Sequence, residues 1–143
     1  MKVRYLIPLM VVGLVGCEPE PRNGPYPRNG PYESYHENGQ LRQKGSYSNG
    51  EEEGPFESYY ENGQLDFKGS YSNGERDGLW EFYYEDGQLR SKGSYSNGPS
   101  DGQWESYYEN GQLRYKGSFS NNDKCGEWIW DGETTTYPPC PNG

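Results

Sequence analysis

A tyrosine-rich pattern recurs along this chain with a period of 24 residues, and it constrains the fold more than any other feature. The aromatic residue that leads each repeat stands at Tyr32, Phe56, Trp80, Trp104 and Trp128. Four full units span residues 32–127, and a fifth begins at residue 128 but does not continue the pattern. Self-similarity on this scale is typical of an array in which each unit is one supersecondary element. We therefore expect the core to be built by stacking copies rather than by folding around one centre.

Each repeat places an Asn-Gly or Asp-Gly pair between a tyrosine-rich run and a leucine, which is a strong signal for a β-hairpin. In the third unit, a two-residue type I′ turn at Asp86-Gly87 predicts that residues 80–85 pair with residues 88–93. The repeats support this register, because equivalent pairs join one large residue to one small residue. These pairs are Phe82–Ser91, Ser106–Tyr115 and Ser58–Phe67. The first unit pairs Ser34 with Gln43 instead, so we expect poorer packing at that end.

The predicted register separates the side chains by face, since neighbouring residues of a strand point to opposite sides of a sheet. One face is apolar and carries the pairs Tyr84–Leu89, Phe82–Ser91 and Trp80–Gly93. A ring over a strand glycine, as in the last pair, fills the space that the missing side chain leaves. The other face carries Glu81–Lys92 and Tyr83–Arg90. We expect Tyr84 and Tyr95 to hold the sheet together and Tyr83 to point outward beside Arg90.

The connection between successive units, such as residues 72–80 (SNGERDGLW), contains two glycine turn signals around a polar pair. This pattern favours a hairpin loop of four or five residues. The fold class is therefore predicted to be all-β, an elongated antiparallel meander of repeated β-hairpins at residues 28–131. The composition agrees, because 29% hydrophobic residues are too few for a thick two-layer core and 16% aromatic residues are too many for a disordered chain.

The N-terminus has the features of a bacterial lipoprotein signal. Lys2 and Arg4 precede an apolar run that is too short to span a bilayer as a helix. Residues 14–17 (LVGC) resemble a lipobox, in which the cysteine is acylated and the peptide is cut before it. We expect a signal peptide at residues 1–16 and a proline-rich linker at residues 17–27 that is held at the membrane by acyl chains on Cys17. Glu18 favours an outer membrane, and an ordinary secretory signal with an incidental cysteine is the alternative.

Two cysteines, Cys125 and Cys140, remain if Cys17 is acylated. Outside the cytoplasm, an even pair of cysteines indicates a disulfide. Such a bond would tie a C-terminal cap at residues 132–143 to the last loop of the array. The alternative is two free thiols.

Residues 68–88 (KGSYSNGERDGLWEFYYEDGQ) and their copies resemble the MORN repeat, and they are most similar to its bacterial variant, often described as YwqK-type antitoxins. The shared residues are Gly69, Tyr71, Gly74, Asp77, Gly78, Trp80, Tyr83, Tyr84 and Gly87. The resemblance covers about residues 28–130 and implies an elongated meander of hairpins. It also implies toxin neutralisation as a function. The last copy departs from the pattern at Asn122 and Cys125, where glycine and aspartate stand in the other units.

Residues that could carry chemistry are few. His36 is the only histidine, and it aligns with Tyr60, Tyr84 and Tyr108, so we interpret it as a substituted face residue. Carboxylates gather at turns such as residues 51–53 and 85–86, and a short turn cannot wrap a calcium ion. The sequence contains no Ser-His-Asp or Cys-His set and no phosphate-binding loop. We therefore predict neither an enzyme nor a cofactor or metal site.

The net charge of −9 opposes binding to nucleic acid. We predict a non-enzymatic, lipid-anchored protein of the bacterial cell envelope whose sheet binds an unidentified protein partner. A repeat protein that binds the cell wall or a polysaccharide is the alternative, because residues 80–89 (WEFYYEDGQL) also resemble the aromatic hairpins of such proteins. Aromatic residues are enriched at interface hot spots. The candidate binding residues are Tyr59, Tyr83, Tyr107, Trp80, Trp104, Arg90 and Arg114.

Overall fold

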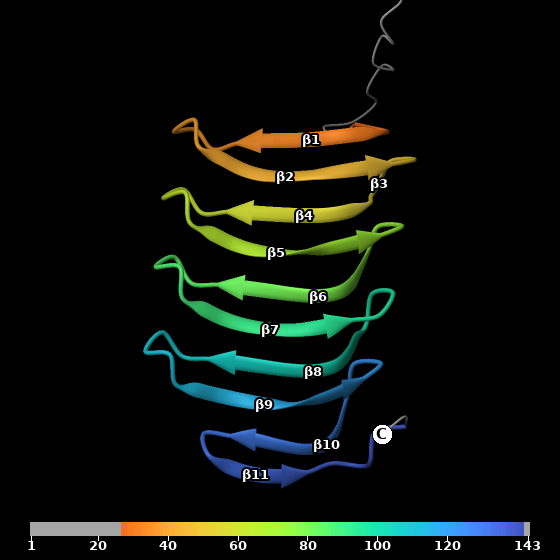
Figure 1. Ribbon diagram of the computed structural model, residues 1–143, viewed down its shortest axis with the longest axis vertical. Coiled ribbons are helices and arrows are strands. Elements are labelled where there is room, and N and C mark those ends of the chain that lie inside the picture. Colours follow the sequence, from red (N-terminus) through yellow and green to blue (C-terminus); the bar gives the residue numbers. More distant parts are fainter. Residues whose placement is uncertain (1–26, 142–143) are drawn as a thin grey trace, which may run out of the picture.

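The structure, a computed structural model, describes residues 27–141, and these residues form one antiparallel sheet of eleven strands in the order of the chain (Figure 1). The predicted all-β meander of hairpins is confirmed. Only the two-residue strand β3 leaves the path, because it pairs with the end of β2. The strands are β1 (Gly30–Tyr35), β2 (Leu41–Ser48), β3 (Glu51–Glu52), β4 (Gly54–Tyr59), β5 (Leu65–Ser72), β6 (Glu75–Tyr83), β7 (Leu89–Tyr95), β8 (Ser100–Tyr107), β9 (Leu113–Ser120), β10 (Asp123–Trp130) and β11 (Glu133–Thr136).

The predicted signal peptide, Cys17 and nearly all of the predicted linker lie outside the described residues. Within residues 27–141, no helix is long and apolar enough to cross a membrane.

The central pairs of the predicted hairpin register are present. Trp80 lies opposite Gly93, Glu81 opposite Lys92 and Phe82 opposite Ser91. The compensating pairs of the other units, Ser58–Phe67 and Ser106–Tyr115, also lie opposite each other. The exchange of large and small residues between strands therefore identified the register correctly over the middle of each hairpin.

The turns within the hairpins differ from the expected two-residue type. Tyr84 donates its backbone N–H to Gln88 at 2.8 Å, and Gly87 donates to Tyr84 at 2.9 Å, which encloses a three-residue loop. In this loop only Gly87 has a positive φ, at 86°, as in a type I turn closed by a glycine bulge. The extra residue shifts the end of the register, so Tyr83 lies opposite Leu89 rather than Arg90.

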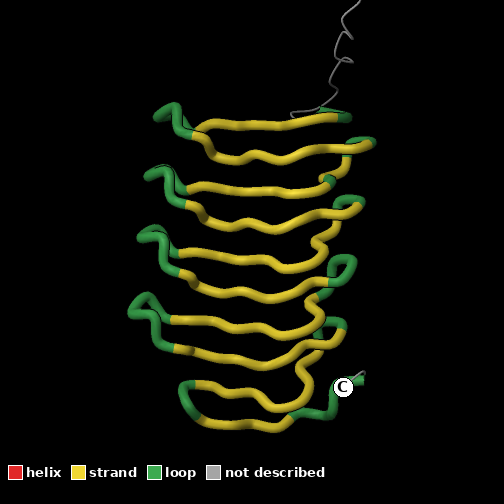
Figure 2. Tube along the Cα trace, in the orientation of Figure 1, coloured by secondary structure: helices red, strands yellow, loops and turns green. Residues whose placement is uncertain are grey.

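The two-residue turns stand instead between successive units, at the opposite ends of the strands (Figure 2). Asn73 and Gly74 have φ values of 51° and 76°, and the positive φ at both positions is the signature of a type I′ turn. The loop of four or five residues predicted there is therefore wrong. The second glycine of the connection, Gly78, lies in a bulge. Between the pairs Lys68–Glu81 and Ser70–Asp77, strand β5 contributes one residue and strand β6 contributes three.

From the second unit on, the leading ring packs over a glycine of the preceding unit, not over the glycine opposite it in its own hairpin. A Cβ atom built on Gly69 would lie 2.2 Å from the Trp80 ring, and one on Gly93 would lie 2.1 Å from the Trp104 ring. The indole Nε1 of Trp80 also donates to the Ser70 carbonyl at 3.1 Å. A ring over a strand glycine was therefore the correct motif, but the glycine belongs to the neighbouring hairpin.

A continuous ladder of rings forms the core. Tyr71 and Tyr95 meet the Trp80 ring edge-on, with centroids 4.9 and 6.1 Å away, and Tyr95 also contacts Trp104 at 5.3 Å. The Arg76 guanidinium lies 4.5 Å from the Trp80 centroid on the same ladder. Together these neighbours bury Trp80 completely, although the sheet has no second layer. Tyr95 therefore holds the sheet together, as expected from the sequence.

The C-terminal segment closes this ladder. The Tyr137 ring contacts Trp128 at 6.2 Å, and Tyr137 donates its backbone N–H to the Gly126 carbonyl at 2.8 Å. Cys125 and Cys140 form a disulfide that joins the tail to β10. The alternative of two free thiols does not apply in this structure.

Candidate binding face

One face of the sheet carries a repeated set of lysine, glutamate and tyrosine side chains, which we call the Lys–Glu–Tyr stripe. Glutamate and tyrosine come from the first strand of a hairpin, and lysine comes from the second strand. The residues of the stripe are Lys44, Glu57, Tyr59, Lys68, Glu81, Tyr83, Lys92, Glu105, Tyr107 and Lys116. Since these positions recur every 24 residues, the stripe crosses all internal repeats.

Three ion pairs of the stripe join one hairpin to the next, and a further pair, Lys116–Glu105, lies within the β8–β9 hairpin. Lys68 Nζ lies 2.6 Å from Glu81 Oε2, and Lys44 Nζ lies 2.9 Å from Glu57 Oε2. Glu81 lies opposite Lys92 in the backbone register, but its ion pair is made with Lys68. The expected Glu81–Lys92 charge pair is therefore corrected to a contact between neighbouring hairpins.

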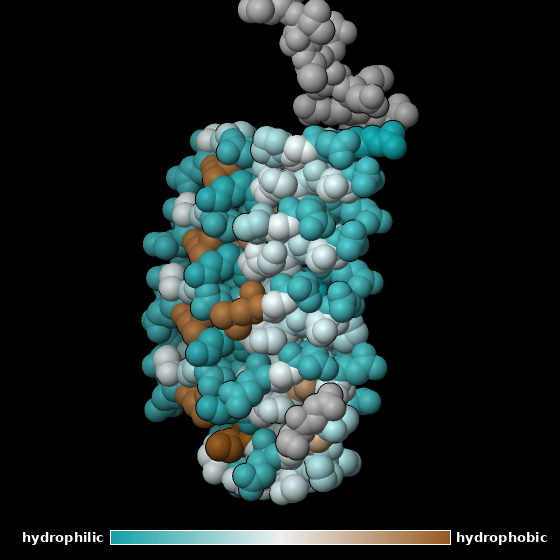
Figure 3. Space-filling view, turned by 45° about the vertical axis from the view of Figure 1, so that its right-hand side comes forward, coloured by the Kyte–Doolittle hydropathy of each residue, from teal (hydrophilic) through white to brown (hydrophobic). Residues whose placement is uncertain are grey.

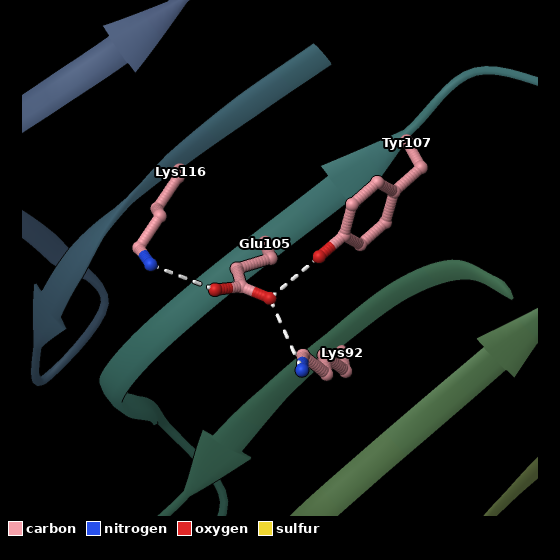
Figure 4. A network of polar contacts seen from close by, with 4 residues as sticks. All are labelled: Lys92, Glu105, Tyr107 and Lys116. Atoms are coloured by element: carbon pink, nitrogen blue, oxygen red, sulfur yellow. Dashed lines mark hydrogen bonds and ion pairs between the residues drawn. The ribbon is translucent and has the colours of Figure 1, made fainter. Parts of the chain in front are cut away.

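Glu105 is the most connected member of the stripe (Figure 4). Tyr107 Oη donates to Glu105 Oε2 at 2.7 Å, while Lys116 and Lys92 lie 2.9 and 3.1 Å from the two carboxylate oxygens. The hydrogen bonds from Tyr107, Lys116 and Lys92 lower the pKa of the Glu105 carboxyl to about 2. Glu105 is therefore ionised at neutral pH, and its position is set from three directions.

The predicted outward tyrosines lie on the stripe and are half-buried. Tyr83 Oη donates to Glu81 at 3.1 Å, and the Lys68 ammonium lies 5.9 Å from the Tyr83 centroid. Leu89, not Arg90, lies opposite Tyr83, and the Arg90 guanidinium lies 5.9 Å from the centroid of the Phe82 ring. Arg114 likewise lies against the ring of Tyr108, at 5.6 Å. The predicted pairing of Tyr83 with Arg90 is wrong, since the three-residue turn shifts the register before Arg90.

Trp80 and Trp104 do not belong to an exposed binding face. Their exposed fractions are 0% and 8%, because each indole is covered by the ring ladder. Their role is packing, and we remove both from the set of candidate contact residues. The face of the molecule drawn in Figure 3 is largely hydrophilic, with isolated hydrophobic residues repeated along one side.

A second row of side chains holds consecutive hairpins together near the three-residue turns. Tyr84 Oη donates to the Tyr107 carbonyl at 2.8 Å, and Tyr60 Oη donates to the Tyr83 carbonyl at 2.7 Å. His36 occupies the same place, with Nε2 at 2.8 Å from the Tyr59 carbonyl. The histidine therefore substitutes for a structural tyrosine.

The sequence interpretation missed the lysines and glutamates of the stripe as site residues. Their signal was present, because lysine precedes the strand glycine and glutamate follows the leading aromatic residue in every full unit. Within residues 27–141, no group of three or more His, Cys, Asp or Glu residues is placed to hold a metal ion. The stripe is therefore a periodic surface of paired charges and half-buried tyrosine rings.

Comparison with known protein families matches four segments to the MORN repeat variant, namely residues 28–49, 52–73, 76–97 and 100–121. The chain belongs to this family. Each matched MORN segment covers one hairpin, from β1–β2 to β8–β9, whereas the β10–β11 hairpin lies outside the matches. A comparison with curated proteins gives no match. The MORN repeats therefore supply the stripe, and the last hairpin with its disulfide-bonded tail forms a cap.

Proposed function

We propose that this MORN-repeat protein is a non-enzymatic binding protein and that the Lys–Glu–Tyr stripe contacts a protein partner. The observation that carries the proposal is the repetition of one arrangement of charge and ring on a continuous sheet. Two strands per repeat place equivalent side chains ~10 Å apart along the sheet. An elongated protein surface can engage several such units together, and tyrosine gives a large contact area at low entropic cost.

The charges of the stripe support binding rather than catalysis. Glu57, Glu81 and Glu105 each have their carboxylate engaged by lysine and tyrosine, so none of them stands ready as a base. The paired groups are held in one geometry before a partner arrives, which reduces the ordering cost of binding.

The proposed location is the bacterial cell envelope, with acyl chains on Cys17 attaching the protein to a membrane, and the outer membrane favoured by Glu18. In this setting the proposed partner is a toxin that the protein neutralises, as the resemblance to YwqK-type antitoxins implies. A toxin or secretion gene beside the gene for this chain would support the immunity role over a general envelope role.

The test compares capture of partners from native envelopes by three forms of the full chain. One form is unchanged, one carries alanine at Tyr59, Tyr83 and Tyr107, and a matched control carries alanine at Glu61, Glu85 and Glu109, which recur with the same spacing in the exposed turns. We expect the unchanged and control forms to capture a protein partner. The tyrosine variant should capture at least about tenfold less of it. Circular dichroism verifies that each form is folded.

Equal capture by the tyrosine variant would show that the stripe is not the contact surface. If no protein is captured but isolated peptidoglycan or polysaccharide co-sediments with the unchanged chain, the alternative of a glycan-binding repeat protein replaces the proposal.

A further inference from the structure

The same interface joins the first four hairpins of the array to one another, whereas between β9 and β10 Lys116 lies opposite Ile129 and pairs with Glu105 instead. The second strand of one hairpin supplies a lysine and a glycine, and the first strand of the next supplies a glutamate and a leading ring. At the first such interface, Lys44 pairs with Glu57, and the Phe56 ring lies over Gly45. The following interfaces use Lys68 with Glu81 and Lys92 with Glu105. Strands β4, β6 and β8 thus each have an accepting side that a preceding lysine-glycine strand fills.

Strand β1 presents this accepting side at the edge of the sheet, where no strand of residues 27–141 covers it (Figure 1). Glu33 corresponds to Glu57, yet within residues 27–141 no lysine or arginine forms an ion pair with it. Tyr35 donates to Glu33 at 2.6 Å, as the other stripe tyrosines do to theirs, but it is 57% exposed. At the following interfaces, the side chains of His36 and Tyr60 form hydrogen bonds with the backbone carbonyls of Tyr59 and Tyr83. In the described chain, no side chain forms this bond with the Tyr35 carbonyl.

The buried hydroxyl of Ser34 is a further sign of an unfilled interface. Its equivalents Ser58 and Ser106 donate to the carbonyls of Arg42 and Arg90 in the preceding strand, at 3.4 and 3.3 Å. Ser34 Oγ is buried but has no hydrogen-bond partner in the described part of the chain. A buried polar group without a partner is costly and uncommon. The acceptor that its position calls for is a carbonyl two residues before the lysine of an added strand.

The proline in β1 does not block such a strand. Pro55 occupies the same position in β4, and β4 still pairs with β2 through Gln43–Ser58 and Lys44–Glu57. The equivalent pairs at β1 would use Glu33 and Ser34, so Pro31 lies beyond the bonded segment.

The other end of the sheet does not repeat the lysine-glycine interface. In β11, Thr135 stands opposite Trp128 where each earlier hairpin has the glycine that receives the next ring. Thr134 replaces the lysine. The array can therefore accept a lysine-glycine strand at β1 but offers none from β11.

We propose that the edge of β1 binds an extended segment of a partner protein by β-strand addition, and that this segment carries lysine followed directly by glycine. The partner lysine pairs with Glu33, the residue before it lies opposite Ser34, and the carbonyl before that accepts from Ser34 Oγ. Backbone hydrogen bonds along β1 supply much of the affinity, while the charge and the small residue supply specificity. This surface is the edge of the sheet, so the proposal stands whether or not the internal stripe binds a partner.

The test measures fluorescence anisotropy of a labelled peptide, QLRSKGSYSN, which copies residues 88–97, on the full-length chain. We expect saturable binding that weakens at least about fivefold for Glu33→Lys and also weakens for Ser34→Ala. A peptide with glutamate in place of lysine should bind the unchanged chain poorly and recover affinity for Glu33→Lys. The control Glu133→Lys makes the same charge change on the opposite edge strand and should leave the affinity unchanged.

Absence of saturable binding, or equal affinities for the unchanged chain and Glu33→Lys, would overturn the proposal. Equal weakening by Glu133→Lys would also overturn it, because it would show attraction to net charge alone. Thermal melting separates these outcomes from unfolding. In particular, Ser34→Ala should not lower the melting temperature, because the free chain loses no hydrogen bond when this hydroxyl is removed.

Discussion

At the scale of single residues, the strand glycines limit the fold more tightly than the turn glycines do. Gly93 has an ordinary strand conformation, but an added Cβ would meet the Trp104 ring at 2.1 Å. Gly39 has a positive φ of 84°, but an added Cβ there would meet no atom within 4 Å. The first glycine is required by packing against the next repeat, and the second is required by backbone conformation alone.

The first prediction concerns Gly93→Ala. The new methyl group cannot share the space of the Trp104 ring, so we expect the free energy of unfolding to fall by about 1–3 kcal/mol. The control Ser96→Ala changes an exposed position directly after the end of β7, and the free energy of unfolding should stay within about 0.5 kcal/mol. Urea unfolding followed by tryptophan fluorescence measures both. If Gly93→Ala is as stable as the control, the close packing of ring on glycine is not a constraint.

At the scale of strands and hairpins, the ion pairs of the stripe make the stability of the interface depend on pH. Glu105 has a pKa of about 2 in the folded chain, against an ordinary value of 4.5. A carboxyl whose pKa is lowered by folding stabilises the folded state fully above its unfolded pKa. This contribution is lost as the pH falls from about 4.5 toward 2.

We therefore predict that Glu105→Gln lowers the free energy of unfolding by roughly 1–2 kcal/mol at pH 7, a value reduced for the partial exposure of both lysines. The difference from the unchanged chain should shrink as the pH falls from about 4.5 toward 2. Unfolding in urea at several pH values gives the comparison, and Glu133→Gln on the exposed strand β11 serves as the control. A difference that stays constant over this range would contradict the assigned network.

The element scale also shows where local sequence signals mislead. Asp86-Gly87 and Asn73-Gly74 look alike as dipeptides, yet the first lies in a three-residue loop and the second forms a two-residue turn. What distinguishes the two turns is the number of residues between the paired residues that flank each dipeptide. Asp86 is held by its own side chain, which accepts from the Gln88 backbone N–H at 2.9 Å.

At the scale of the whole molecule, the two ends of the array are unlike. The N-terminal edge retains an unfilled copy of the repeat interface, and the C-terminal end is closed by β11, Tyr137 and the Cys125–Cys140 disulfide. Each hairpin contacts only its neighbours, so loosening the cap should reduce local stability most around Trp128 and less in each hairpin farther from the cap.

The third prediction follows from this arrangement. The disulfide closes a segment of 15 residues, so replacing both cysteines with serine should cost about 3 kcal/mol in unfolding free energy. Hydrogen exchange should show the largest loss of protection in β10 and β11 and little change in β4. The unchanged chain under reducing conditions is the matched control and should behave as the serine variant does. Unaltered protection in β10 and β11 would mean that the tail does not serve as a cap.

The sequence by itself determined the 24-residue unit, the all-β meander, the middle of each hairpin register and the pair of cysteines that closes the tail. These features depend on alternation, turn residues and covalent chemistry, which are local properties of the chain. Only the tertiary structure decided which neighbours meet, such as Trp80 with Gly69 and Lys68 with Glu81. The reason is that the loop closing each hairpin and the bulge between hairpins displace one strand against the next, so the partner of a side chain depends on both strands and not on the local pattern of either.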